Sequence, residues 1–284
     1  MKYLNKFLLG LAICALFLAS ACQNQKEEIV ADDVVSPEVL QTLHTMGFST
    51  DRVLKTEGGY IVENDIFIPT ERLGEVPTHS FWLRDGDEEQ YRTTNVVNTN
   101  GNRTITVYIQ IGGSGGFSTT YGSALDEAIA RFNAENLDLS FERVTFSTGA
   151  NIRFSRLSRR DENRGVLGSA GFPSNGNPFN QIRMSGILES TFGLSVNGIA
   201  TIMAHEMGHC IGFRHTDYFD RSISCGGGTS NEGAGTVGAI NIPGTPTGAS
   251  LSAQSWMLAC TDGSNRPFNN DDKTALAWMY VNNF

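Results

Sequence analysis

Apolar positions along the chain follow two periods, one typical of helices and one typical of strands. Helical spacing of apolar residues marks residues 37–46, 125–132, 196–213 and 275–279. Runs rich in apolar, β-branched or small residues mark extended segments over residues 58–68, 104–111, 139–146, 151–157, 165–173 and 181–186. The chain is therefore expected to mix helices and strands, with the strands preceding the long apolar helix at residues 196–213.

An apolar run from Phe7 to Leu18 follows two lysines at the start of the chain. The run is shorter than the ~20 apolar residues of a membrane-spanning helix, so residues 1–21 are predicted to be a secretory signal. The ending L-A-S-A-C resembles a bacterial lipoprotein signal with Cys22 as the acylated residue, although Leu18 lies one position further from the cysteine than is usual. The alternative is an ordinary signal that leaves Cys22 as a spare thiol.

Residues 22–35 are polar and acidic, which predicts a flexible tether. The sequence Lys26-Glu27-Glu28 within it resembles a signal that sends some bacterial lipoproteins to the cell surface. We therefore expect an exported lipoprotein at the outer membrane or cell surface, from which the C-terminal domain could be released.

The formal charge of the 284 residues is −9, and removal of residues 1–21, with two lysines and no acidic residue, makes it −11. An acidic surface disfavours nucleic acid and anionic membranes as partners. We expect no nucleic-acid partner, membrane attachment only through an N-terminal lipid, and a monomer.

One stretch reads A-H-E-M-G-H-C-I-G-F-R-H-T. On a helix, His205 and His209 lie one turn apart on the same face, as two ligands of one metal ion require. Glu206 is beside them and can contact a water at the metal without being a ligand. Gly212 allows the chain to leave the helix, so that His215 can supply a third imidazole. Three imidazoles leave a fourth tetrahedral position on zinc for a water whose pKa falls toward ~7.

These residues resemble the zinc signature H-E-x-x-H-x-x-G-x-x-H of the metzincin metallopeptidases. The sequence H-C-I-G-F-R-H-T-D is similar to the bacterial dual-action metallopeptidase family of the myxobacterial protease B type. The resemblance implies one catalytic Zn²⁺ bound by His205, His209 and His215, with Glu206 as the general base. A structural Ca²⁺ has no support in the sequence.

The resemblance also implies an α+β fold: a twisted mixed sheet and two main helices above a zinc cleft, with a small loop-rich lower subdomain that ends in a helix. The catalytic domain would span residues 97–284, with an upper part at 97–215 and a lower part at 216–284. Met257 occupies the position of the metzincin Met-turn and would support the histidines from below. An edge strand above the zinc would pair with the substrate backbone through Leu167, Gly168, Ser169 and Ala170.

Residues 36–96 are predicted to be a propeptide, or N-terminal segment, followed by a linker. The sequence from Val62 to Ile66 resembles the F-x-G-D-I segment of astacin-type propeptides, in which the aspartate takes the zinc position of the water. Asp65 is therefore a candidate latency ligand, and a solvated turn aspartate is the equal alternative. The polar, acidic stretch 75–102 is predicted to be either a cleavable linker or a solvated loop.

Three cysteines follow the signal and the cysteine assigned to lipid, which allows one disulfide and one free thiol. Cys225 with Cys260 is the preferred pair, and Cys210 with Cys260 is the alternative. Asp217 follows the third histidine closely, where it could accept a hydrogen bond from that imidazole or act as a cap or turn residue.

Together these residues predict a zinc-dependent endopeptidase made as a zymogen, with protein or peptide as its substrate. The alternative is a surface adhesion or binding lipoprotein with a non-catalytic zinc site. Glu206 argues against this alternative, because a structural zinc site normally has a fourth protein ligand and needs no base.

Overall fold

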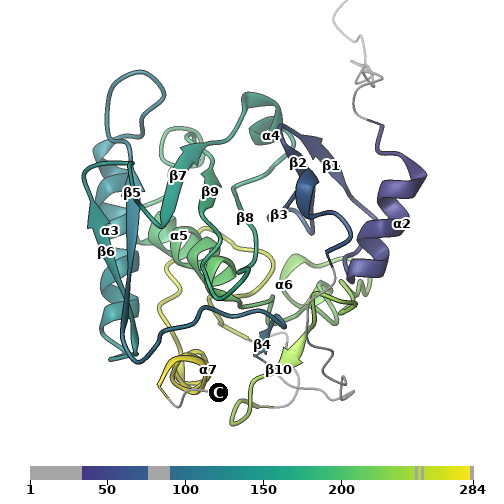
Figure 1. Cartoon of the computed structure of the whole chain (residues 1–284). Coiled ribbons are helices and arrows are strands. Elements are labelled where there is room, and N and C mark those ends of the chain that lie inside the picture. The colour runs from purple at the N-terminus through teal and green to yellow at the C-terminus, as the bar shows by residue number, and fades with distance from the viewer. Residues whose placement is uncertain (1–33, 76–89, 247–248, 251–252, 282–284) are drawn as a thin grey trace, which may run out of the picture. The chain divides into compact units, whose positions relative to one another are not determined.

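Within residues 34–75, 90–246, 249–250 and 253–281, which the computed structural model describes, the fold is built on an eight-stranded mixed sheet (Figure 1). The strand order is β1-β2-β3-β8-β9-β7-β5-β6. The strands are β1 (Leu54–Thr56), β2 (Gly59–Val62), β3 (Ile66–Pro69), β5 (Arg103–Ile109), β6 (Leu139–Val144), β7 (Ile152–Arg156), β8 (Gly168–Ala170) and β9 (Gln181–Met184). Strands β5, β6, β7 and β9 run parallel, while β8 is antiparallel to β9. The predicted α+β class is confirmed.

Two long helices, α3 (Thr119–Asn133) and α5 (Val196–Ile211), pack against each other and supply much of the main hydrophobic core. The hydroxyl of Ser195 caps the start of α5 by accepting from the amide of Gly198. From Gly198 to Ile211 every residue of α5 is buried. A helix that is buried on all sides is held rigidly, so side chains that it carries are fixed in place.

Residues 36–75, called the N-terminal layer from here on, pack as a small layer against the residues that follow residue 90. Helix α2 (Pro37–Met46) precedes the antiparallel strands β1, β2 and β3 and the 3₁₀ turn η2 (Thr70–Arg72). Their apolar side chains form a second hydrophobic cluster with Phe172, which follows β8. The last strand, β3, pairs in parallel with β8 at Ile66 and Ala170. Strand β8, expected at the edge of the sheet, is therefore an interior strand while residues 36–75 are in place.

The short helix α4 (Arg159–Asn163) connects β7 to β8. The residues after α5 form a loop-rich region that contains the short helix α6 (Ser222–Cys225) and the final helix α7 (Asn270–Tyr280). A capping box between Asn269 and Asp272 starts α7. A disulfide joins Cys225 to Cys260, the pair preferred from the sequence, and Cys210 is a buried free thiol. Among the described residues, no helix is long and apolar enough to cross a membrane.

The stretch predicted as a linker or solvated loop is in part a buried piece of the fold. Strand β4 (Tyr91–Arg92) pairs with β10 (Ile240–Asn241), and the side chains of Gln90, Tyr91 and Val97 are buried. The solvated-loop alternative is wrong for much of residues 90–99, because their backbone forms hydrogen bonds with distant segments that the local polar composition does not reveal. The cleavable linker stays a prediction. The acidic run within residues 76–89 lies outside the described residues.

Candidate metal centre

Helix α5 carries two of the three histidines of the motif. The rings of His205 and His209 lie one turn apart, with centroids 4.6 Å from each other and Nε2 atoms 3.0 Å apart. Each ring uses its other nitrogen for a backbone carbonyl: His205 Nδ1 lies 2.9 Å from Trp256 O, and His209 Nδ1 lies 2.9 Å from Phe213 O. These bonds assign the proton to Nδ1 and leave a lone pair on each Nε2.

Gly212 brings the third histidine into the same site. Its φ of 115° ends α5 in the left-handed region, and a Cβ at this position would lie 3.0 Å from Asn95 O. Residues of β4 and its flank hold the turn, because Thr93 N donates to Gly212 O and Arg214 N donates to Tyr91 O. His215 then places its ring 4.9 Å from that of His209 and 5.3 Å from that of His205, between centroids.

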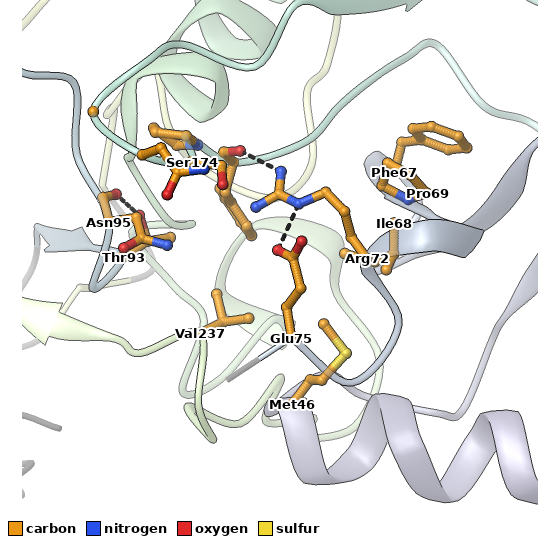
Figure 2. A pocket seen from close by; sticks show the side chains of 14 residues that line it. Met46, Phe67, Ile68, Pro69, Arg72, Glu75, Thr93, Asn95, Ser174 and Val237 are labelled. Carbon is orange, nitrogen blue, oxygen red and sulfur yellow. Dashed lines mark hydrogen bonds and ion pairs between the residues drawn. The ribbon is translucent and has the colours of Figure 1, made fainter. Parts of the chain in front are cut away.

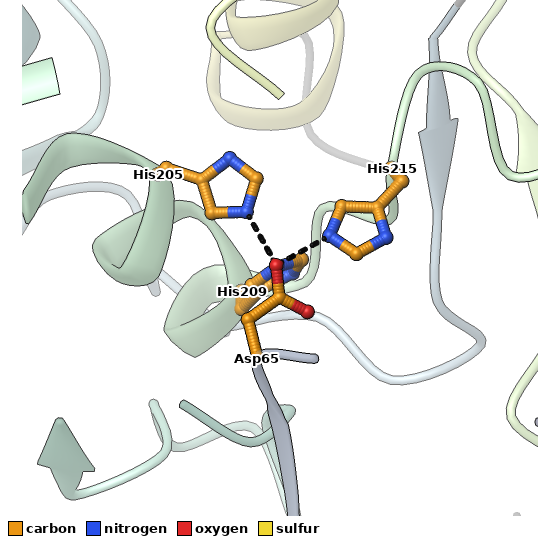
Figure 3. Close-up of side chains that lie close together, drawn as sticks. All are labelled: Asp65, His205, His209 and His215. Atoms are coloured by element: carbon orange, nitrogen blue, oxygen red, sulfur yellow. Dashed lines mark hydrogen bonds and ion pairs between the residues drawn. The ribbon is translucent and has the colours of Figure 1, made fainter. Parts of the chain in front are cut away.

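Asp65 enters this group of imidazoles from the N-terminal layer (Figure 3). Its Oδ2 lies 3.0 Å from His215 Nε2 and 3.4 Å from His205 Nε2. The carboxylate follows a turn in which Glu63 and Asn64 both have positive φ, 55° and 72°. Asparagine tolerates this conformation, but a positive φ is unusual for a glutamate, so the backbone at Glu63 is held by its surroundings.

The donor atoms of the four side chains fit a metal ion. One ligand atom from each of Asp65, His205, His209 and His215 lies within 4.8 Å of the others, and Asp65 Oδ1 has no hydrogen-bond partner among the described residues. The lone pairs on the two helical Nε2 atoms would repel each other at 3.0 Å without a cation. Three imidazoles and one carboxylate are a ligand set that suits zinc.

The charges of the site depend on one another. Burial opposes ionisation of Asp65, but His215 and His205 outweigh burial and hold the pKa of Asp65 well below its usual value. Burial likewise opposes the charge of His215, yet Asp65 and Glu232 raise its pKa well above the usual value. Burial and the two other histidines lower the pKa of His209. The site therefore stabilises the ionised form of Asp65 together with a positive charge among the histidines.

Glu206 lies beside the histidines and is almost completely buried. Burial, and next the charge of Asp65, raise the pKa of Glu206 well above its usual value. Its Oε2 has no hydrogen-bond partner among the described residues. Its Oε1 faces β8 so closely that a Cβ at Gly168 would lie 2.4 Å from it. A cavity of about 170 Å³ borders this carboxylate and is lined in part by Leu167, Ile202, Leu258 and Arg266.

Met257 packs against α5 rather than pointing to solvent. It is fully buried, and a Cβ at Gly208 would lie 2.7 Å from Met257 Sδ and 2.5 Å from the ring of Trp256. The same turn supplies the carbonyl that orients His205. Asp272 anchors the turn by accepting from Ser255 Oγ at 2.7 Å.

Asp217 does not contact the third histidine as an acceptor. Its carboxylate accepts from Ala259 N at 2.9 Å and from Ser224 Oγ at 2.6 Å, and so ties the chain after His215 to the loop that carries the disulfide. The acceptor for His215 Nδ1 is instead Glu232 Oε1, at 2.7 Å. Sequence reasoning missed Glu232, since a separation of 17 residues within a loop leaves no periodic signal.

A larger cavity of about 380 Å³ lies away from the histidines (Figure 2). The N-terminal layer lines one side of it, and residues 93, 95, 172–176 and 237 line the other. Phe67, Arg72 and Val237 are among its lining residues. Arg72 closes one side of it through Glu75 and the carbonyl of Phe172. None of the four metal-binding candidates lines this cavity.

The family model described as dual-action HEIGH metallo-peptidase matches residues 61–280. The chain belongs to this family of metallopeptidases. Its motif reads H-E-M-G-H where the family description spells H-E-I-G-H, and the glycine common to both is Gly208, which has no room for a side chain. The predicted family is confirmed.

No curated protein matches the sequence of this metallopeptidase. A solved structure titled "Structure of myroilysin" is 17% identical, covers 66% of this chain and 99% of that chain, and has a TM-score of 0.38. As a peptidase, the chain acts on protein or peptide, and one cluster of side chains that could hold its metal is formed by Asp65 and the three histidines.

Proposed function

We propose that this metallopeptidase is a zinc-dependent endopeptidase made as a zymogen. His205, His209 and His215 would hold the zinc ion, and the convergence of their Nε2 atoms supports this assignment. Zinc in such a site supplies Lewis acidity and lowers the pKa of a water toward ~7. Met257 would support the ligands through its contact with α5.

Glu206 is the proposed general base. Its free Oε2 would take a proton from the attacking water and return it to the leaving amine. The adjoining cavity of about 170 Å³ offers room for one substrate side chain next to the scissile bond.

Strand β8 is the proposed site for the substrate backbone. Its outer side bonds to the N-terminal layer through Ala170 N, which donates to Asp65 O at 2.9 Å. A peptide could take the same row of backbone groups once that layer has left. The substrate and residues 36–75 therefore compete for one edge of the sheet.

The observation that carries the zymogen proposal is the position of Asp65. Its Oδ2 lies 3.0 Å from His215 Nε2, where the carboxylate would take the coordination position of the water. Activation would remove residues 36–75 by cleavage in the segment that follows. The proposed parts of the chain are a propeptide and linker at residues 36–96 and a catalytic domain at 97–284, although the buried contacts of β4 argue for a mature start near residue 90.

Export and anchoring are a separate part of the proposal. Residues 1–21 would be the signal, Cys22 the lipidated residue and residues 22–35 the tether; residues 1–33 lie outside the described residues. The mature protein would then be a monomer at the outer membrane or cell surface, with its catalytic domain released by activation.

The test uses the fragment of residues 90–284 with and without Glu206→Gln. The fragment should contain one zinc ion and cleave members of a fluorogenic peptide library, and the variant should keep the metal but lose ~10²–10⁴-fold in turnover. Glu189→Gln, which changes an exposed carboxylate, should leave turnover unchanged. Bound zinc with equal and negligible turnover in wild type and E206Q would overturn the enzymatic proposal.

A further inference from the structure

The three histidines of the site differ in the group that accepts their Nδ1 proton. His205 and His209 donate to backbone carbonyls, which are neutral. His215 donates to a carboxylate, Glu232 Oε1, at 2.7 Å, and both side chains are completely buried. A charged acceptor makes the opposite ring nitrogen a better electron donor than a neutral acceptor does.

Two arginines pair with Glu232 in this buried position. Arg214 NH2 lies 3.4 Å from Glu232 Oε2, and Arg221 forms an ion pair with Oε1, the oxygen that also faces His215. With a guanidinium group at each oxygen, the buried side chain is held as a charge-assisted acceptor facing His215 Nδ1.

The backbone fixes the same residue in place. Glu232 N donates to Tyr218 O at 2.8 Å, and Arg221 N donates to Ser230 O at 2.8 Å, so the chain that follows the third histidine is tied to the loop that carries Glu232. The side chains of His215 and Glu232 are both completely buried, so the surrounding packing restricts their rotamers. The geometry is that of a side chain built to orient an imidazole.

We propose that Glu232 is a positioning residue for His215: by accepting the Nδ1 proton it fixes the tautomer and ring orientation that turn Nε2 toward the metal. This inference rests on the proposed zinc site. The rival interpretation is that Glu232 only neutralises Arg214 and Arg221 in the interior. The two interpretations predict different zinc affinities for two variants, one in which Glu232 loses its charge and one in which Arg221 loses its charge.

The experiment measures Zn²⁺ affinity of the full-length chain by competition with a chelator. Glu232→Gln keeps the size of the side chain and should lower zinc affinity by ~10–100-fold. Arg221→Gln removes the ion pair but keeps the bond between Glu232 and His215, so its zinc affinity should stay within a few-fold of wild type. Asp217→Asn, a buried carboxylate near His215 in sequence that does not contact it, should also leave affinity unchanged.

Labelling with ¹⁵N-histidine gives a second readout that a purely structural role would not move. In E232Q the Nδ1 resonance of His215 should shift, while those of His205 and His209 stay in place. If E232Q does not fold, the double variant Glu232→Gln with Arg221→Gln is measured in its place. It removes one negative and one positive charge together, so the net charge of the buried cluster is unchanged.

Three outcomes separate the possibilities. Selective loss of zinc affinity in E232Q supports the positioning role. Equal affinity in E232Q and wild type, or equal losses in E232Q and R221Q, would overturn it. A wild-type chain that binds no zinc would overturn the proposed function itself, and with it the role of Glu232.

Discussion

Asp65 and His215 are separated by 150 residues, yet Asp65 Oδ2 lies 3.0 Å from His215 Nε2. The contact joins the turn between β2 and β3 of the N-terminal layer to the last histidine of the motif. Glu63, two residues earlier, reaches the neighbour of that histidine, with Oε2 3.5 Å from Arg214 NH2. The N-terminal layer is thus attached to the metal centre by two carboxylates, one at the imidazoles and one at the arginine beside them.

Substitution of Gly168 should affect Glu206 without removing a ligand. A Cβ at position 168 would lie 2.4 Å from Glu206 Oε1, so Gly168→Ala must displace the carboxylate. A displacement near 1 Å at a catalytic group costs on the order of 10²-fold in rate. We expect kcat of the activated enzyme to fall by that order while zinc content is unchanged.

Ser169→Ala is the control for this variant. Ser169 is the next residue of β8, and its buried hydroxyl has no hydrogen-bond partner among the described residues. Its kcat should stay close to wild type. Equal kcat values for G168A and wild type would show that Glu206 does not depend on the glycine.

Gly208→Ala should destabilise the fold. The added methyl group would meet the Trp256 ring at 2.5 Å and Met257 Sδ at 2.7 Å in a fully packed interior. Overpacking of this kind costs about 1–3 kcal/mol of unfolding free energy. Denaturant unfolding of the metal-free protein measures it, and a free energy equal to that of wild type would contradict the packing described for Met257.

A fragment that starts at residue 97 should be less stable than one that starts at residue 90. The shorter fragment lacks Tyr91, whose ring packs 4.4 Å from that of Tyr218 between centroids, and Thr93, whose amide donates to Gly212 O. We expect a lower melting temperature and weaker zinc binding, because these residues hold the turn before His215. Matching melting temperatures and zinc affinities would show that residues 90–96 are dispensable.

Stability should depend on pH through Asp272. Burial raises the pKa of Asp272 to about 7, although the groups that donate hydrogen bonds to its carboxylate lower the pKa in part. Because the pKa is higher in the folded state than in the unfolded state, where it is ~3.9, this group's contribution is greatest below pH ~4 and is lost as the pH rises toward 7. Asp272→Asn should therefore remove a fall in unfolding free energy between pH 4 and 7 that wild type shows. Parallel pH profiles for the two proteins would contradict this.

The sequence was sufficient for the parts of the site that local geometry determines. Helix α5 follows from its apolar residues, the pairing of His205 and His209 from their spacing, and the turn to His215 from Gly212. The candidate role of Asp65 came from a family resemblance, and its position among the imidazoles agrees with that role.

Long-range pairing determined what the sequence did not predict. The contact of Glu232 with His215 depends on how a loop returns to the helix, and the burial of Tyr91 depends on strand pairing with residues 240–241. Strand β8 reads as an edge strand because no local pattern reveals that β3 pairs with it. Asp217 was the nearer carboxylate along the chain, but the loop fold directs it to the amide of Ala259.

The most direct test of the account is the peptidase activity of the uncleaved full-length chain carrying Asp65→Ala. The variant should cleave the peptide library at least about tenfold faster than wild type. In wild type the Asp65 carboxylate occupies the metal site, so only a minor fraction of the molecules admits water to it. Asp51→Ala, an exposed aspartate of the same layer, should behave as wild type, and Glu206→Gln in the D65A chain should abolish the gain. Equal activities of D65A and wild type before any cleavage would contradict the account.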